Sequence, residues 1–358
     1  MRSISAAQVG ESVLGLRRRR SRWTLLAAAA LVSALQLLPL RAADRVELRA
    51  YGSIEVDEVE EWIAAFERAN PDIKLSLVRG STGVLTARIL AEGAAPHADV
   101  IWRLADSSLI KFEREGLLEP YTPKGWSEIA PAFRPRSVPP AWVAHMGYMG
   151  VICTNPAEMQ RLGIGPVSSW RDLLDPRLRG RIVMPSPASS GTGLLHLTSW
   201  LAQLGEAAGW DYVAALNGNI AFYTSSGSKP CALAAAGEYP IGLSFSTRGA
   251  ALKAQGAPIE LIFPREGVGR DIEGSAILVG TRNLAAAQRF MDWVIGAQAM
   301  RLYGKRYPLL GAGDAPALPF HPNRPHTLVT PMDSYALAAK REQVIRKWEQ
   351  AHSQKTEP

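Results

Sequence analysis

The sequence predicts an α/β fold built as two lobes that are joined by crossover strands. The 358 residues are 47% hydrophobic, which is enough to bury a large core and exceeds what one domain usually holds. Short apolar runs with strand character alternate with segments of helical spacing, the pattern of sheets covered by helices. The sequence has no long linker, so strands that cross between the lobes are expected to form a hinge.

The elements follow one another as strand, helix and strand from residue 46 onward. Residues 46–51 form a short apolar strand, residues 56–66 have apolar side chains at helical spacing, and Asn70-Pro71 stops that helix. Alternation of this kind predicts mainly parallel sheets. Further strands are expected at 73–78, 99–102, 145–153, 181–184, 241–246 and 259–263, and further helices at 84–91, 107–115, 193–204, 210–217 and from 284 onward.

The same alternation indicates where the lobes divide. We expect lobe 1 to be built from residues 44–147 with a return segment at 264–300, and lobe 2 from residues 148–263. Residues 301–358 follow as C-terminal helices and a tail, and the polar residues 352–358 are expected to fray.

Residues 1–43 are typical of a signal peptide. Arginines at 17–20 and 22 precede an apolar run over 23–38, and Ala42 and Ala43 are small residues suited to cleavage. A retained membrane anchor is the alternative, but a spanning helix needs about 20 apolar residues and this run is shorter. We expect a periplasmic protein that is cleaved near residues 42–43, and both the Sec and the twin-arginine export routes stay open.

Six of the seven formal positive charges come from the leader. Residues 1–43 hold seven arginines and one acid, so 33 basic and 32 acidic residues remain after it. The sequence beyond the leader has no stripe of lysine and arginine, which a nucleic-acid interface needs. The charge pattern therefore argues against nucleic-acid binding.

Two cysteines, Cys153 and Cys231, are expected to form one disulfide. An even count without metal-ligand spacing favours a bridge in an oxidising compartment. Closing a loop of this length stabilises a fold by about 4 kcal/mol. Two buried thiols are the alternative.

Three corners where a strand gives way to a helix are rich in serine, threonine and glycine, and they span residues 81–83, 189–193 and 224–229. At the carboxyl ends of parallel strands, the N–H groups of the following helices point outward and bind anions. Serine and threonine are also ordinary helix N-caps, so any single corner has a purely structural explanation. Two corners on opposite lobes would instead grip a tetrahedral oxyanion as the lobes close. The candidate residues for this grip are Ser81, Thr82, Ser189, Ser190, Gly191, Thr192, Tyr223 and Ser226.

Three acids are candidates for holding a ligand ammonium, namely Glu55, Asp271 and Glu273. For Glu55 the alternative is a place near the first turn of a helix, where acids complement the helix dipole. Trp102 and Tyr223 lie at the ends of strands and could wall the cleft, the role expected of Trp102, although most aromatic residues at strand ends are part of the core.

Two long stretches are specific enough to indicate a family. They read Val-Met-Pro-Ser-Pro-Ala-Ser-Ser-Gly-Thr-Gly at 183–193 and Tyr-Thr-Ser-Ser-Gly-Ser-Lys-Pro-Cys at 223–231. Through them, and through shorter stretches at 69–73, 81–83 and 98–102, the sequence resembles the periplasmic 2-aminoethylphosphonate-binding proteins of ABC importers, relatives of the iron(III)-binding proteins. The resemblance runs from about residue 47 to about residue 303.

The resemblance implies a type II periplasmic-binding fold and a monomeric binding subunit, not an enzyme, that delivers 2-aminoethylphosphonate to a permease in the inner membrane. No cofactor is expected, and no metal, because the adjacent tyrosine pair of the iron-binding relatives is missing. Arg103, Arg270 and Ser246-Thr247 stand where the family is expected to have other residues. The added cations favour a more anionic solute, so another small anion such as a phosphate ester is the alternative ligand.

A serine acyl-enzyme is a competing interpretation, since Ser226 and Lys229 have the Ser-x-x-Lys spacing of a lysine-activated serine. The sequence lacks the companion motifs of such enzymes, and its six histidines have no zinc-site spacing. A solute sensor that signals to a membrane receptor is a third class, which sequence alone does not separate from an importer subunit.

Overall fold

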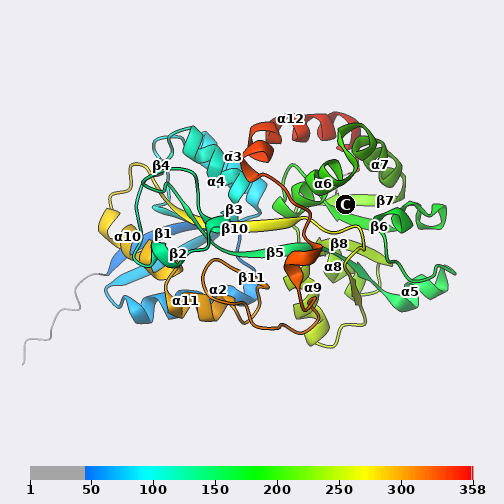
Figure 1. The fold of residues 1–358 in the computed structure, drawn as a ribbon, viewed down its shortest axis with the longest axis horizontal. Helices are drawn as coiled ribbons and strands as arrows, with labels where there is room; N and C mark the ends of the chain where they lie inside the picture. The colour runs from blue at the N-terminus through cyan, green and yellow to red at the C-terminus, as the bar shows by residue number, and fades with distance from the viewer. Residues whose placement is uncertain (1–44, 356, 358) are drawn as a thin grey trace, which may run out of the picture. The chain divides into compact units, whose positions relative to one another are not determined.

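The computed structural model describes residues 45–355 and residue 357 (Figure 1). The expected signal peptide and its cleavage site lie outside the described residues. The strands are β1 Val46–Gly52, β2 Ile73–Arg79, β3 Val100–Ala105, β4 Leu118–Glu119, β5 Val143–Thr154, β6 Ile182–Pro185, β7 Ile220–Thr224, β8 Ile241–Phe245, β9 Glu260–Ile262, β10 Arg270–Leu278 and β11 Leu309–Leu310. The α-helices are α2 Val56–Ala69, α3 Thr82–Glu92, α4 Asp106–Arg114, α5 Pro156–Arg161, α6 Gly191–Leu204, α7 Glu206–Asn219, α8 Lys229–Ala235, α9 Ser246–Ala254, α10 Leu284–Val294, α11 Ala297–Tyr303 and α12 Ser334–His352. Short 3₁₀ helices span Trp126–Glu128, Pro131–Phe133, Trp170–Leu174, Pro176–Leu178 and Pro325–Leu328.

Helix α2 shows how the sequence sets such boundaries. Its buried Trp62 and Phe66 lie one turn apart on the face that packs into the core. Glu58 lies in the first turn, where a carboxylate complements the helix dipole. The helix ends before Asn70, because Pro71 disfavours helical geometry in the residue that precedes it.

The strands form two parallel groups that antiparallel strands connect. Strand order is β2-β1-β3-β10-β5-β8-β6-β7. β1 pairs in parallel with β2 and β3, and β6 pairs in parallel with β7 and β8. β5 pairs antiparallel with β10 through its first half and with β8 through its second half, so it belongs to both groups. β5 and β10 run across the middle of the fold in Figure 1.

This arrangement confirms the two-lobed α/β fold with crossover strands. The expectation of mainly parallel sheets holds only within each group, because β10 is antiparallel to both β3 and β5. No strand was expected at Arg270–Leu278, where charged residues and Gly274 hide the apolar pattern. All nine residues are buried or half-buried in the structure, so contacts with the rest of the fold override the local sequence signal.

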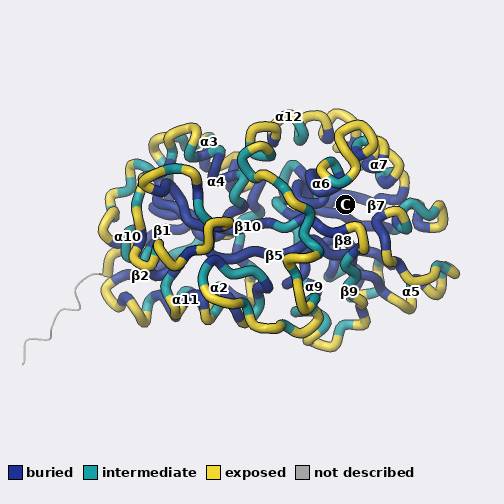
Figure 2. Tube along the Cα trace, in the orientation of Figure 1, coloured by how far each residue is buried: buried dark blue, intermediate teal, exposed yellow. Residues whose placement is uncertain are grey.

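Two large hydrophobic cores lie on either side of this crossover. The first takes its buried residues from Leu48 to Tyr148 and again from Ile272 to Tyr307, with Leu195 and Phe245 added from the other side. The second takes them from Met149 to Val268, with Trp348 added. We call the part built on the first core lobe 1 and the part built on the second core lobe 2. Figure 2 shows the buried strands of both lobes with the more exposed helices around them.

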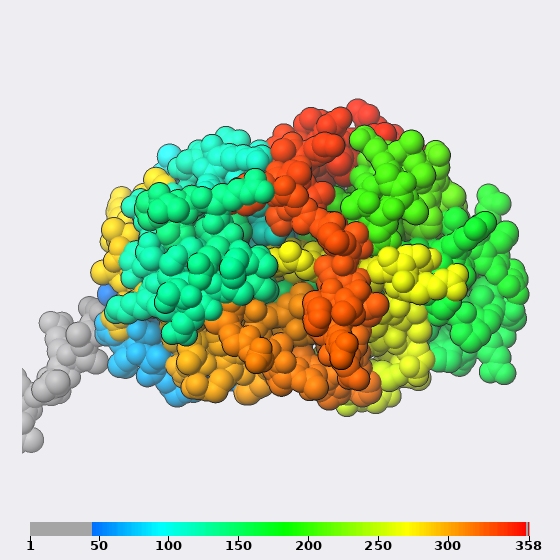
Figure 3. Space-filling view, in the orientation of Figure 1, coloured from blue at the N-terminus to red at the C-terminus, as the bar shows by residue number. Residues whose placement is uncertain are grey.

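The C-terminal segment contacts both lobes. Lys111 of α4 in lobe 1 forms an ion pair with Glu342 of α12, at 2.5 Å. Farther along α12, the ring of Trp348 packs on that of Tyr223 in lobe 2, with centroids 4.8 Å apart. Figure 3 shows the residues after α11, in orange and red, running along the surface between the two lobes.

The expected fraying of the tail is wrong for its described part. The N–H of Tyr223 donates to the carbonyl of Lys355 at 2.8 Å, and the Lys355 ammonium donates to the carbonyl of Ile220 at 2.7 Å. A polar tail is held here because it adds hydrogen bonds to β7, which sequence polarity alone does not reveal.

Cys153 of β5 and Cys231 of α8 form the expected disulfide. They lie in a small buried cluster of lobe 2 with Val151, Ala234 and Ile259. Within residues 45–355, none of the helices has the length and apolar character needed to cross a membrane.

Candidate functional site

A cavity of about 330 Å³ lies where the two lobes meet. This volume is at the small end of the roughly 300–1,000 Å³ that is typical of small-molecule sites. Lobe 1 lines it with Ser53, Glu55, Arg79, Gly80, Ser81, Thr82, Val84, Arg103 and Glu273. The crossover strand β5 adds Tyr148. Lobe 2 lines it with Ser190, Gly191, Thr192, Ser225, Ser226, Gly227 and Phe245.

The first and second serine-rich corners touch across the lobes. The N–H of Gly83, in the first turn of α3, donates to the carbonyl of Ser189 at 3.0 Å. A Cβ atom on Gly83 would lie 2.2 Å from the carbonyl oxygen of Ala188, so this approach requires glycine. The start of α3 in lobe 1 is therefore pressed against the loop that leads into α6 in lobe 2.

The third corner packs against the second within lobe 2. A Cβ atom on Gly227 would lie 2.5 Å from Oγ1 of Thr192 and 3.1 Å from Oγ of Ser190. Ser190 is the N-cap of α6, and its hydroxyl accepts from the N–H of Gly193 at 3.5 Å. The structure therefore brings all three corners to one cavity.

This end of the cavity offers neutral hydrogen-bond donors. The first N–H groups of a helix have no acceptor inside the helix, and α3 and α6 both begin at the cavity wall. The hydroxyls of Ser81, Thr82, Thr192 and Ser226 lie among the same lining residues. Such a set of donors suits an oxyanion, because helix N-termini favour negative charge.

Another part of the lining, contributed by lobe 1, is ionic. Arg103 is 2% exposed and binds Glu273 through both Nε and a terminal nitrogen, at 2.8 and 2.6 Å. Arg79 lies 3.8 Å from a carboxylate oxygen of Glu55. Burial raises the pKa of Glu273 to about 7, although Arg103 acts against the shift. Burial also raises the pKa of Glu55, against the effects of Arg79 and Arg248.

Most of the predicted site residues lie in the lining of this cavity. Ser81 and Thr82 come from the first corner, and Ser226 comes from the third. The second corner contributes Ser190, Gly191 and Thr192, and the acids Glu55 and Glu273 complete the set. The assignment of these residues to particular ligand groups stays a prediction.

Four other predicted residues lie outside the lining. Ser189 is behind it, with its carbonyl bound to Gly83 and its hydroxyl donating to the carbonyl of Ser225 at 3.4 Å. Tyr223 is in the core of lobe 2 against Trp348, where its hydroxyl donates to Asn217 at 2.9 Å. The side chain of Tyr223 follows the alternation of β7 into the core, which a one-residue difference in strand register would reverse.

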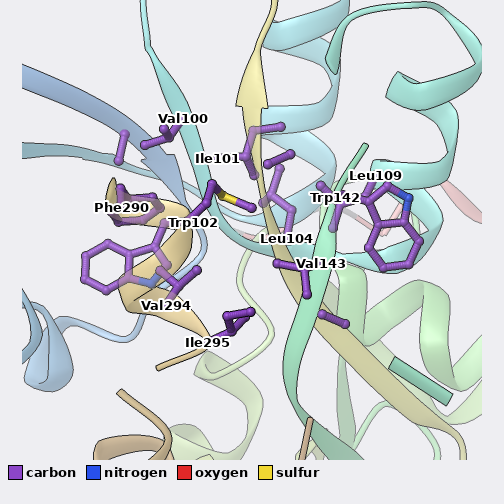
Figure 4. Packing of buried hydrophobic residues seen from close by; sticks show 14 of the residues in the cluster. Val100, Ile101, Trp102, Leu104, Leu109, Trp142, Val143, Phe290, Val294 and Ile295 are labelled. Atoms are coloured by element: carbon purple, nitrogen blue, oxygen red, sulfur yellow. The ribbon is translucent and has the colours of Figure 1, made fainter. Parts of the chain in front are cut away.

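Asp271 and Trp102 are each adjacent to a lining residue, Tyr148 and Arg103 respectively, but do not line the cavity themselves. The carboxylate of Asp271 accepts from the hydroxyl of Tyr148 at 3.1 Å and borders a second, smaller cavity. Burial, followed by the neighbouring Asp106 carboxylate, raises the pKa of Asp271 well above its usual range. Trp102 is fully buried in the core of lobe 1 and packs edge-on against Phe290, with ring centroids 5.5 Å apart (Figure 4). Strand alternation directs the Trp102 side chain away from the cleft that it was expected to wall.

Several lining residues were not selected from the sequence, including Ser53, Arg79, Tyr148 and Phe245. Arg79 is the last residue of β2 and Ser53 directly follows β1. Their place at the carboxyl ends of parallel strands is a usable signal, since ligands bind at that edge. Tyr148 and Phe245 carry no such signal, because each lies in a strand that reads as buried on both faces.

Two features bear on the competing interpretations, namely the acidic, histidine and cysteine side chains and the surroundings of Ser226 and Lys229. Residues 45–355 hold no group of three or more His, Cys, Asp or Glu side chains placed to bind a metal ion. The Lys229 ammonium pairs with Glu357, and the Ser226 hydroxyl lies 3.0 Å from that of Ser228. Lys229 is therefore not positioned to activate Ser226.

Known proteins resemble this chain in sequence and in fold. An uncharacterised protein of Haemophilus influenzae is 33% identical over 287 residues, which cover 78% of this chain and 83% of the relative. A probable ABC transporter periplasmic-binding protein of Sinorhizobium fredii is 27% identical, covering 72% of this chain and 71% of the relative. The periplasmic binding protein AfuA of Actinobacillus pleuropneumoniae, solved with fructose-6-phosphate bound, superposes with a TM-score of 0.78 at 29% identity, covering 86% of this chain and 99% of AfuA.

The family model that matches spans residues 95–324 and describes a bacterial extracellular solute-binding protein. That stretch includes β5 and β10, which join the lobes, and the second and third corners of the cavity. Proteins of this kind bind solutes outside the cytoplasm and do not transform them, which excludes the acyl-enzyme interpretation of Ser226 and Lys229. The fold, the interlobe cavity and the sequence match together show that the chain belongs to the bacterial extracellular solute-binding protein family.

Proposed function

We propose that this protein captures a small organic molecule carrying a phosphonate or phosphate-ester group in the periplasm and delivers it to an ABC permease. The protein is a solute-binding subunit of an ABC transporter for a small ligand. The probable periplasmic-binding protein of Sinorhizobium fredii is a relative with this role. The proposal concerns the chemical group that the cavity recognises.

The convergence of the three serine- and threonine-rich corners carries this proposal. A phosphonate or phosphate ester has several oxygens on one tetrahedral phosphorus, and each oxygen accepts hydrogen bonds from different directions. The starts of α3 and α6 and the loop before α8 supply donors from three directions and from both lobes. Because the donors of both lobes act together only when the lobes meet, binding favours the closed state.

Two ligands fit this recognition. The sequence resemblance points to 2-aminoethylphosphonate, with its ammonium held by Glu55 or Glu273. A phosphate ester is the alternative, and the structural neighbour AfuA was solved with one, fructose-6-phosphate. Both present the same kind of oxyanion, so the corners alone do not choose between them.

Calorimetric titration of the purified mature protein with 2-aminoethylphosphonate, fructose-6-phosphate, inorganic phosphate and ferric ion tests the proposal. We expect an organic phosphorus oxyanion to bind, and Thr192→Ala to weaken that binding by roughly 1–3 kcal/mol through loss of a hydrogen bond to a charged group. Thr198→Ala is the matched control, since Thr198 lies in the same helix and its hydroxyl donates to the carbonyl of Leu194. Binding of ferric ion alone, or equal affinities of wild type and Thr192→Ala, would contradict the proposal.

A further inference from the structure

Arg103 has a backbone conformation that arginine rarely adopts. Its φ is +62°, in the left-handed region that glycine favours. It is the extra residue of a β-bulge, since Gly274 of β10 pairs with Leu104 while Ser275 pairs with Trp102. Bulges re-aim side chains next to functional sites, and residues held in rare conformations cluster at such sites.

The bulge directs the Arg103 guanidinium between two buried carboxylates. One terminal nitrogen binds Glu58 at 2.6 Å, and Nε and the other terminal nitrogen bind Glu273. The guanidinium carbon also lies 4.7 Å from the centre of the Tyr307 ring, whose hydroxyl donates to both oxygens of Glu58 at 3.0 Å. Arg103 is thus held on several sides and is itself part of the cavity lining.

The acids at this end of lobe 1 are matched by arginines, and of these acids Glu55 and Glu273 line the cavity. Arg103 forms ion pairs with Glu58 and Glu273. Arg306 binds Asp57 at 2.7 Å and lies 3.9 Å from Glu58. Arg79 and Arg248 both act on Glu55. Four carboxylates therefore face four guanidinium groups, namely Glu55, Asp57, Glu58 and Glu273 against Arg79, Arg103, Arg248 and Arg306.

We propose that Arg103 is a built-in counter-ion that sets ligand specificity, so that the cavity accepts a phosphorus oxyanion with a neutral, hydroxyl-bearing body and disfavours an aminoalkyl body. The inference rests on the proposed function and selects between its two ligands. A ligand ammonium near Glu273 would meet the guanidinium that already binds this carboxylate, and like charges at short range repel.

A hydroxyl meets no such obstacle. Both contacts from Arg103 fall on Oε2 of Glu273, and no donor among the described residues binds its Oε1. A ligand hydroxyl can donate to a carboxylate oxygen of this kind without bringing further positive charge into the site.

Three phosphonates that differ at one end test this inference on the wild-type protein. They are 2-aminoethylphosphonate, 2-hydroxyethylphosphonate and ethylphosphonate, which share the oxyanion and the two-carbon body. Calorimetric titration of the mature protein is expected to show the hydroxyl compound binding about tenfold more tightly than the amino compound. Tighter binding of the amino compound would overturn the inference and leave the proposed function standing. Fructose-6-phosphate is titrated alongside them, and if none of the four compounds binds, the proposed function fails, and the inference fails with it.

Substitutions of Arg103 separate its charge from its volume. Arg103→Gly and Arg103→Met remove the cation, and both are expected to shift the preference toward the amino compound by about tenfold or more. Arg103→Lys keeps a cation and is expected to keep the wild-type order. If Arg103→Gly and Arg103→Met leave the order unchanged, the counter-ion role is refuted. If neither variant folds, the wild-type order decides.

Discussion

The two lobes provide different chemistry to the same cavity. Lobe 1 contributes every charged residue in the lining, namely Glu55, Arg79, Arg103 and Glu273. Lobe 2 contributes hydroxyls, glycines and one phenylalanine, and Tyr148 of the crossover strand adds a phenol. The neutral donors lie at the starts of α3 and α6 and before α8, where the lobes touch.

This difference suggests a division of labour between anchoring and selection. Neutral donors bind an oxyanion without first losing a counter-ion, so they suit the group that all ligands of the site share. Paired charges are costly to bury and are sensitive to the charge of whatever approaches them. The ionic wall of lobe 1 is therefore the part that distinguishes one ligand body from another.

The largest expected effect comes from Gly227→Ala, which disturbs the neutral hydrogen-bond donors of lobe 2. In Gly227→Ala the new methyl group would lie 2.5 Å from Oγ1 of Thr192, and both Thr192 and Ser190 would have to move. We expect phosphonate or phosphate-ester affinity to fall on the order of 100-fold, since two hydroxyls are displaced together. The measurement is calorimetric titration.

Gly218→Ala is the matched control for that change. Gly218 lies in α7, and a Cβ atom there would meet nothing within 4 Å. Alanine is better than glycine in a helix, so the control is expected to bind as wild type does. Wild-type affinity in Gly227→Ala would remove the third corner from the binding site.

Single hydroxyls from the two lobes are expected to have smaller and similar effects. Ser81→Ala removes a hydroxyl of lobe 1, and Ser226→Ala removes one of lobe 2. Each is expected to weaken binding by about 1.5 kcal/mol, on the order of tenfold, the lower end of the range for a hydrogen bond to a charged group. If titration shows that one variant matters and the other does not, the oxyanion is held by one lobe only.

The two cores are expected to respond differently to acid. Burial lowers the pKa of His196 in lobe 2 to about 4 and that of His145 in lobe 1 to about 3. Both are neutral in the folded protein, so the unfolded chain binds more protons below its pKa of about 6.5, and stability falls as pH falls. In lobe 1, Glu273 has the opposite effect on stability. Its pKa of about 7 in the folded protein lies above its pKa in the unfolded chain, so the folded protein binds this proton at higher pH and gains stability as pH falls.

The test of this difference is the free energy of unfolding at pH 7 and at pH 5. His196 alone is expected to lower it by roughly 2 kcal/mol between pH 7 and pH 5. His196→Gln keeps an amide that can donate to the carbonyl of Ser244, which lies 2.9 Å from Nε2 of His196. It is therefore expected to lose less stability on acidification than wild type, and an equal loss would show that His196 does not titrate on unfolding.

The sequence predicted the anchoring part of the site better than the selecting part. Ser190 and Thr192 follow a strand and open a helix, and that local order alone places their donors at a sheet edge. Arg103 depends on a bulge whose partner strand, β10, lies about 170 residues along the chain. Pairing at that distance leaves no local pattern, so neither the strand nor the role of Arg103 could be read from periodicity.

The same reasoning explains the two aromatic residues that the structure places elsewhere. Trp102 and Tyr223 were assigned to the cleft because they end strands. Each strand directs alternate side chains to opposite faces, and the choice of face depends on register. In the structure both rings pack in cores, against Phe290 and Trp348 respectively.

A crystal structure of the mature protein with fructose-6-phosphate tests the central claim most directly. We expect the phosphorus atom to lie between the first turns of α3 and α6 and the loop at 225–227, with hydroxyls of the sugar toward Glu273. A phosphorus atom bound instead to the Arg103 guanidinium, or one outside the gap between the lobes, would contradict the account.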